Sequence, residues 1–175
     1  MKLLTSLLVL LCPAVLLATD PSPYAGEELR SIKSLSKEEI ESLRLGSGMG
    51  FAKLAELNHF PGPKHVLEVA EQIELSATQR EATEALFQEM RQAAIALGEE
   101  LVLAEMNLDR AFATSTITEE QLQAALLDIG RLQARLRFVH LEAHLRQNRL
   151  LTADQVRRYD AVRGYGDAGH TRHEH

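Results

Sequence analysis

The sequence predicts an all-α fold built on a long antiparallel helical hairpin, with short helices before it and one short helix after it. Three observations lead to this prediction. The pattern Leu-Ser/Thr-x-x-Gln occurs twice, at residues 75–79 and 151–155. Between the two copies, two long segments carry apolar residues at steps of three and four, the period of one helix face. A polar break at residues 114–118 separates these two segments.

Each copy of the pentapeptide is a helix start of the capping-box type. The hydroxyl of the Ser or Thr can accept the N–H of the third helical residue, and the Gln three positions on can reach back to the cap's own N–H. The sequence therefore predicts helices that begin near residue 77 and after residue 152, and the same box pattern at residues 36–39 and 118–121 predicts two more helix starts. The motif consists of six residues, Leu75, Ser76, Gln79, Leu151, Thr152 and Gln155.

The first eighteen residues have the pattern of a secretory signal peptide. Lys2 is followed by an almost unbroken apolar run from Leu3 to Ala18. A retained transmembrane anchor is the alternative, but the run is short for a membrane span. Cys12 lies inside the run and is the only cysteine of the chain, so cleavage would leave a mature protein without disulfides or thiolate chemistry.

Composition restricts the class of protein further. A chain of 175 residues allows one domain, and its formal net charge of −6 argues against a nucleic-acid partner. No tryptophan is present and few aromatic residues, so the core must be aliphatic. The sequence contains no nucleophile–base pair and no phosphate-binding loop that would indicate an enzyme.

The region before the hairpin divides into two parts. Residues 19–34 contain prolines and a glycine and are predicted to be a flexible leader. Residues 35–73 form an extension of short helices, which we expect at 36–45, at 51–58 and from Pro63 to about residue 73. His59 and His65 flank the proline turn within this extension and are assigned structural roles. The extension is expected to pack on the hairpin or to reach a partner subunit.

Residues 74–165 form the predicted hairpin domain, in which each long helix carries one apolar stripe. Gly98 lies off the first stripe and is expected to bend that helix. Two facing stripes make a coiled-coil-like seam. A hairpin this thin leaves apolar surface exposed, which predicts either a homodimer or cover from residues 35–73. The stripes are Leu86, Met90, Ala93, Leu97, Leu101, Ala104, Leu108 and Ala111 on the first helix, and Leu122, Ala125, Ile129, Leu132, Leu136, Val139 and Ala143 on the second.

Paired pentapeptides that frame a helical hairpin behind a secretion signal resemble the Spy/CpxP family of periplasmic chaperones and stress regulators. The related periplasmic heavy-metal sensor and zinc-resistance proteins share this architecture. The resemblance covers about residues 64–165. It implies a periplasmic, ATP-independent chaperone or envelope-stress modulator that needs no cofactor. Unfolded or misfolded envelope proteins would be its clients. A third possible function is that of a purely structural adaptor, in which case the protein would dock on a membrane sensor protein.

Charge is divided between the two arms of the hairpin, since acidic residues dominate 66–120 and arginines dominate 131–163. One interpretation is ion pairing across the flanks of the seam. The other is a cationic strip beside apolar surface, where charge would speed the encounter with unfolded chains and apolar contacts would retain them. The arginines expected to contact clients are Arg131, Arg135, Arg137, Arg146 and Arg149.

Histidines provide the alternative function, a divalent heavy-metal-binding sensor or resistance protein. His140 and His144 are four residues apart and therefore share one helix face, where they could chelate Zn²⁺, Ni²⁺, Co²⁺ or Cu²⁺ with a third ligand. Glu89 is expected level with His144 on the facing helix and is the predicted third ligand. The alternative to metal binding is that the two imidazoles are structural and are hydrogen-bonded to carboxylates such as Glu89. Residues 166–175 form a predicted disordered tail that could bind metal loosely through His170, His173 and His175.

Overall fold

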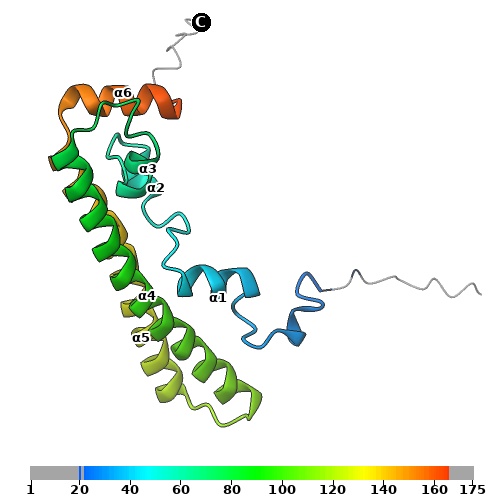
Figure 1. The fold of residues 1–175 in the computed structure, drawn as a ribbon. Helices are drawn as coiled ribbons and strands as arrows, with labels where there is room; N and C mark the ends of the chain where they lie inside the picture. Colours follow the sequence, from blue (N-terminus) through cyan, green and yellow to red (C-terminus); the bar gives the residue numbers. More distant parts are fainter. Residues whose placement is uncertain (1–19, 21, 166–175) are drawn as a thin grey trace, which may run out of the picture.

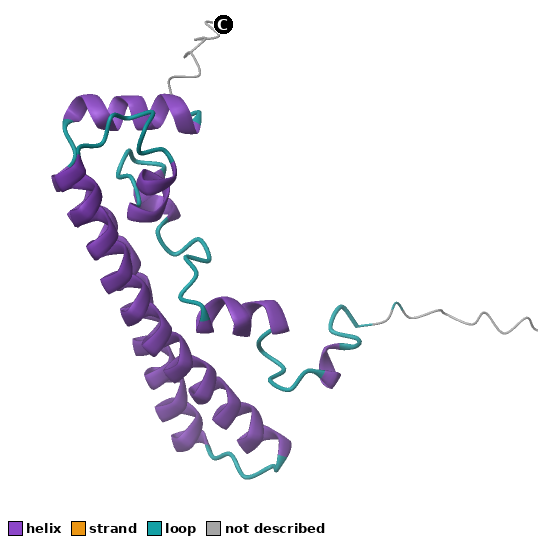
Figure 2. Ribbon diagram, viewed as in Figure 1, coloured by secondary structure: helices purple, strands orange, loops and turns teal. Residues whose placement is uncertain are grey.

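The computed structural model of the chain describes residue 20 and residues 22–165, and this part is all-helical, as predicted. Figure 2 shows helices joined by loops, without a strand in the described residues. The predicted signal peptide and the tail with its three histidines lie outside these residues. The elements are η1 (Glu27–Leu29), α1 (Lys37–Arg44), α2 (Lys53–Glu56), α3 (Pro63–Glu68), α4 (Ala77–Ala113), α5 (Glu119–Leu150) and α6 (Ala153–Arg163).

Helices α4 and α5 form the predicted antiparallel hairpin and run side by side along its whole length (Figure 1). They contain 37 and 32 residues, which corresponds to about 55 Å and about 48 Å at ~1.5 Å per residue. The chain reverses at 114–118, where Ser115 has a positive φ of 53°. No helix in the part of the chain that the structure describes is long and apolar enough to cross a membrane.

All four capping boxes form as the sequence predicts. In each one, the Ser or Thr oxygen accepts the backbone N–H of the third helical residue at 3.1–3.3 Å. The Glu or Gln at that position accepts the backbone N–H of the cap in return, so two otherwise unpaired N–H groups are satisfied at each helix start. The four cap residues are Ser36, Ser76, Thr118 and Thr152.

The two pentapeptides also bind each other, at the open end of the hairpin where α6 crosses it (Figure 1). Nε2 of Gln79 donates to Oε1 of Gln155 at 2.9 Å, and Nε2 of Gln155 donates to Oε1 of Gln79 at the same distance. The second hydrogen of each amide reaches a backbone carbonyl, that of Leu150 for Gln79 and that of Glu74 for Gln155. The two helix starts are therefore one hydrogen-bonded unit, a role that their sequence pattern as separate caps did not predict.

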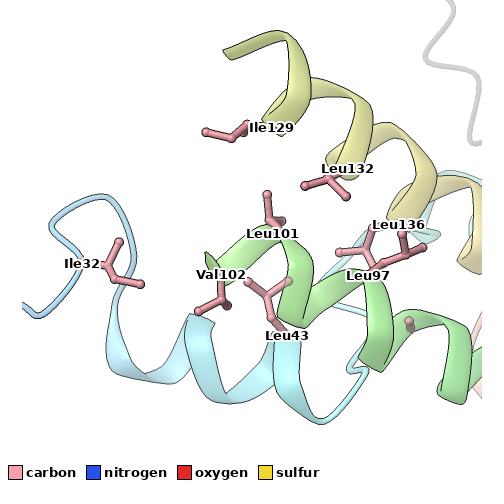
Figure 3. Packing of buried hydrophobic residues seen from close by; sticks show 9 residues of the cluster. Ile32, Leu43, Leu97, Leu101, Val102, Ile129, Leu132 and Leu136 are labelled. Atoms are coloured by element: carbon pink, nitrogen blue, oxygen red, sulfur yellow. The ribbon is translucent and has the colours of Figure 1, made fainter. Parts of the chain in front are cut away.

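The main core lies where α1 meets the hairpin, not only in the seam between the long helices. Figure 3 shows side chains of α5 pointing at those of α4, while Leu43 of α1 packs on the other side of α4. The buried members of this core are all aliphatic, as the composition predicts. Its buried members are Ile32, Leu43, Ala94, Leu97, Leu101, Val102, Ile129, Leu132 and Leu136.

Gly98, which was expected to bend α4, has a packing role that the sequence did not predict. The residue is buried against the backbone of Leu43, and a Cβ atom at this position would overlap the Leu43 carbonyl oxygen. The glycine therefore serves to let α1 approach the backbone of α4. Burial of Ala94 and Val102 beside the predicted stripe has the same cause, because α4 is covered on two sides.

The extension at 35–73 packs on its own hairpin, which was one of the two expectations for it. Its second and third helices are shorter than predicted, since α2 has four residues and α3 ends at Glu68. Beyond α3 the chain continues in turns, and Val69 and Ile73 are buried there with Tyr159 of α6 in a second small core. The apolar pattern at 66–73 was correct as a sign of burial, but tertiary contacts satisfy it without a continued helix.

Candidate functional site

Glu56 of α2 is a buried carboxylate at which four segments of the chain meet. Its Oε1 accepts the hydroxyl hydrogen of Tyr159 from α6, and its Oε2 accepts the backbone N–H of Gly62 at 3.3 Å. Nδ1 of His65 lies 3.5 Å from Oε1, and Nδ1 of His144 lies 3.8 Å from Oε2. Only 8% of Glu56 is exposed, so these groups replace water around it.

The partners of Glu56 keep it ionised. Burial alone would raise the pKa of this carboxyl, but the close approach of His65, the hydrogen bond from Tyr159 and the neighbouring imidazoles outweigh burial and hold the pKa below its ordinary value. Burial and the bond to Glu56 raise the pKa of Tyr159, so its hydroxyl stays protonated and continues to donate. The carboxylate therefore joins the extension to both α5 and α6.

His144 fastens the proline turn of the extension to α5. Its Nδ1 lies 2.7 Å from the carbonyl oxygen of Phe60, which the ring reaches as a donor. The ring also lies against Gly62, where a Cβ atom would come within 2.8 Å of Cε1 and Nε2. Burial lowers the pKa of His144, although the bond to Phe60 and the charge of Glu56 act in the opposite direction.

His140 lies one turn earlier on the same helix face and is 4% exposed. Its ring stacks on Phe51, with centroids 5.7 Å apart and planes at 19°. Nε2 is buried without a hydrogen-bond partner among the described residues. Burial and then the neighbouring His144 lower the pKa of this imidazole. A neutral ring packs at this place with the smallest desolvation cost.

The three residues of the predicted helical metal site contact different partners in the structure. His140 and His144 share a face of α5, as expected, but both are engaged with the extension. Glu89 binds Arg146 through two bonds of 2.7 and 2.8 Å, and the carboxylate near His144 is Glu56 instead. Within residues 22–165, no three His, Cys, Asp or Glu side chains are arranged to hold a metal ion.

This cluster also contains Glu56, Tyr159 and Arg163, which no sequence pattern predicted. Tyr159 is 103 positions from Glu56 in the chain, and neither residue belongs to a spacing pattern. Nε of Arg163 lies 3.9 Å from Oε1 of Glu56. The proline turn beside His59 and His65 was the only sign of a structured junction at this place. His59 does bind α6, through a bond of 2.8 Å from its Nδ1 to Asp160.

The side of α5 that faces away from α4 carries a second apolar stripe. We call this the outer face of α5 and define it by Leu127, Ala134, Phe138, Leu141 and Leu145, which recur at steps of three, four and seven. Leu127 is 55% exposed, Phe138 60% and Leu145 48%. This stripe was not predicted, although it has the same spacing of three and four residues as the seam.

The five arginines predicted to contact clients divide into two groups around this face. Arg146 binds Glu89, and Arg135 lies 3.7 Å from Glu100, so these two pair across the hairpin. The others are exposed and have no ion-pair partner among the residues that the structure describes. These three are Arg131, Arg137 and Arg149.

Because His140 and His144 are buried, we expect the protein to lose stability in mild acid. Because burial lowers the folded-state pKa values of His140 and His144, the unfolded chain takes up protons that the folded chain does not. Their contribution is complete above the unfolded-state value of about 6.5 and is lost as the pH falls from there through the folded-state values. Glu56 from α2 and His65 from α3 are the charged or titratable groups that face His144 from the packed elements, and the lowered pKa of Glu56 adds a further loss only below about pH 4.5.

Urea unfolding at about pH 7.5 and about pH 5.5 measures this effect. We expect a lower free energy of unfolding at the lower pH, with a smaller difference for His140→Phe, which keeps the stacking on Phe51 and removes one titrating group. Equal losses in the two proteins would show that His140 is not a source of the pH dependence.

The chain was also compared with known proteins. No family model, no curated protein and no solved structure matches it.

Proposed function

We propose that the protein is a periplasmic, ATP-independent chaperone or envelope-stress modulator that holds unfolded or misfolded envelope proteins on the outer face of α5. The observation that carries the proposal is the pairing of this exposed apolar stripe with three arginines that have no acidic partner among the described residues. The proposal is for a binding protein without catalytic chemistry.

Apolar and cationic groups have separate tasks on such a surface. Exposed leucine and phenylalanine side chains gain free energy when an unfolded segment covers them, at about 25 cal/mol per Å² of apolar area. The arginines attract acidic segments and increase the rate of encounter, and salt screens this attraction. A surface of this kind releases its client when the client folds and buries its own apolar residues.

A second copy of this chain is the rival occupant of the outer face, because a stripe of this spacing also suits a coiled-coil seam. Charge favours the unfolded chain. Residues 131–163 carry eight arginines against three acidic residues, so two such faces would bring like charges together. The homodimer stays a prediction, and sedimentation of the same protein samples that are used in the aggregation assay below measures it.

We expect the purified protein to delay the aggregation of a reduced or heat-unfolded client in the absence of nucleotide, and to do so less well at high salt. Phe138→Ser should weaken the protection, because it removes the most exposed aromatic ring of the outer face. Phe112→Ser is the matched control, since Phe112 is a similarly exposed phenylalanine (54%) at the far end of α4 and lies outside the outer face. Light scattering of the client follows both variants.

Three results would contradict the proposal. The first is an absence of protection at several-fold molar excess, and the second is equal protection by the two variants. The third is a dimer that Phe138→Ser converts to a monomer without a change in protection, which would assign the outer face to a second copy.

Metal sensing and docking on a membrane sensor protein stay predictions. No observation on the described residues favours either function. His140 and His144 contact the extension, and Glu89 binds Arg146.

A further inference from the structure

A cavity of about 730 Å³ lies between the extension and the hairpin. The glycine-rich loop at 45–50, α2, the start of α3, α4 and α5 all contribute to its wall. Its volume falls within the range of roughly 300–1,000 Å³ that is usual for small-molecule sites. The cavity is separate from the outer face of α5, and the proposed function does not use it.

Most of the wall is apolar. Met49 and Leu57 line it from the extension, and Phe87 and Met90 line it from α4. Two of these four are methionines, whose flexible side chains adapt to ligands of different shape. Such a wall suits the hydrocarbon part of a ligand.

The charges at the cavity are mainly positive. Lys53, Lys64 and Arg91 line it, and Glu56 is the single carboxylate among the lining residues. Both oxygens of Glu56 are already hydrogen-bonded, to Tyr159 and to the backbone of Gly62. Lys53 and Arg91 have no carboxylate within ion-pair distance among the described residues, whereas Lys64 lies 3.9 Å from Glu68. The cavity therefore has positive charge that this part of the chain does not neutralise.

His140 is a second sign that the cavity takes a ligand. The residue lines the wall, is 4% exposed, and holds a buried ring nitrogen without a partner in the described residues. Buried polar atoms of folded proteins nearly always have a partner, which can be a bound molecule. Nε2 of His140 is one such atom, in a residue that lines the cavity.

From these observations we propose that the cavity binds a single-chain amphiphile with an anionic head, such as a fatty acid or a lysophospholipid. The acyl chain would lie against the methionine and phenylalanine side chains. The carboxylate or phosphate head would lie toward Lys53, Lys64 and Arg91. A carboxylate and a phosphate share the chemistry that these cations recognise.

Calorimetric titration of the purified protein tests the proposal with four probes. Decanoate carries the chain and the anionic head, acetate carries the head alone, and decyltrimethylammonium carries the chain with the opposite charge. Decanoyl lysophosphatidylglycerol carries the same chain on a lipid phosphate. We expect one equivalent of decanoate or of the lysophospholipid to bind, and neither acetate nor the cation to bind at the same concentration. The tighter of the two anionic probes identifies the source of the ligand.

Charge reversal at Lys53 provides the matched pair of variants. Lys53 and Lys37 are both exposed lysines at the first position of a short helix, but only Lys53 lines the cavity. We expect Lys53→Glu to weaken binding about tenfold, because an attraction becomes a repulsion, and Lys37→Glu to leave it unchanged. His140→Phe should also weaken binding, since it removes the unpartnered nitrogen and keeps an aromatic ring on Phe51.

Phe138→Ser distinguishes the cavity from the outer face of α5. We expect this variant to bind the anionic amphiphile as the unmodified protein does, even where it loses protection of a client. Failure of both anionic probes to bind would overturn the proposal, and so would equal binding of the cation or equal effects of Lys53→Glu and Lys37→Glu. None of these results would bear on the aggregation assay.

Discussion

Glu56→Ala is expected to lower the free energy of unfolding by about 3 kcal/mol. The substitution leaves the Tyr159 hydroxyl and the Gly62 N–H buried without their acceptor. It also removes the negative charge that lies beside His65 and His144. Because Glu56 joins the extension to α5 and α6, we expect amide hydrogen exchange to accelerate in α2, α3 and α6 and to change less at the α4–α5 turn.

Glu99→Ala is the control for this experiment, since Glu99 is an exposed glutamate on α4, and we expect a change within about 0.5 kcal/mol. Glu56→Gln keeps the shape and an acceptor oxygen, so it should cost less than Glu56→Ala and separates loss of charge from loss of hydrogen bonding. If Glu56→Ala unfolded at the same denaturant concentration as Glu99→Ala, Glu56 would not be the junction of these segments.

Gly98→Ala is expected to destabilise the protein by about 2 kcal/mol, although alanine is the better helix former. The added Cβ atom would overlap the Leu43 carbonyl oxygen, so α1 must move away from α4. That movement opens the core around Leu43 and Val102, which Figure 3 shows on opposing helices. Chemical denaturation measures the loss, and exchange of the α1 amides shows where it occurs.

Gly130→Ala is the matched variant and should have the opposite sign. Gly130 is also a glycine inside a long helix, but a Cβ atom there meets nothing within 4 Å. The gain in helix propensity then acts alone and should stabilise the protein by up to about 1 kcal/mol. Two changes of the same sign would contradict the assignment of Gly98 as the site where α1 approaches α4.

Local patterns in the sequence were sufficient for the helical elements of the hairpin. A capping box needs only a Ser or Thr and a Glu or Gln three residues later, so all four helix starts could be predicted from adjacent residues. The apolar steps of three and four likewise predicted the seam, because a helix face is determined by spacing along the chain. The extent of α3 was less accurate, since burial of Val69 and Ile73 against Tyr159 replaced helix continuation there.

The candidate site could be predicted only in part. The shared face of His140 and His144 follows from their spacing, but Glu89, the predicted third ligand, binds Arg146. Which atoms these side chains contact depends on residues from other segments. Arg146 competes successfully for Glu89, while Phe51 and Phe60 of the extension approach the two histidines.

The sequence by itself determined that this protein is an all-helical hairpin with capped ends, because caps and apolar periods are properties of neighbouring residues. Only the tertiary structure decided that Gln79 and Gln155 pair, that Gly98 admits α1, and that Glu56 joins four segments. The pairing of the two glutamines, the approach of Leu43 to Gly98, and the contacts of Glu56 with α5 and α6 all join residues more than fifty positions apart. The free energy of such a contact depends on burial and on the direction of approach, and neither quantity is encoded in the spacing of nearby residues.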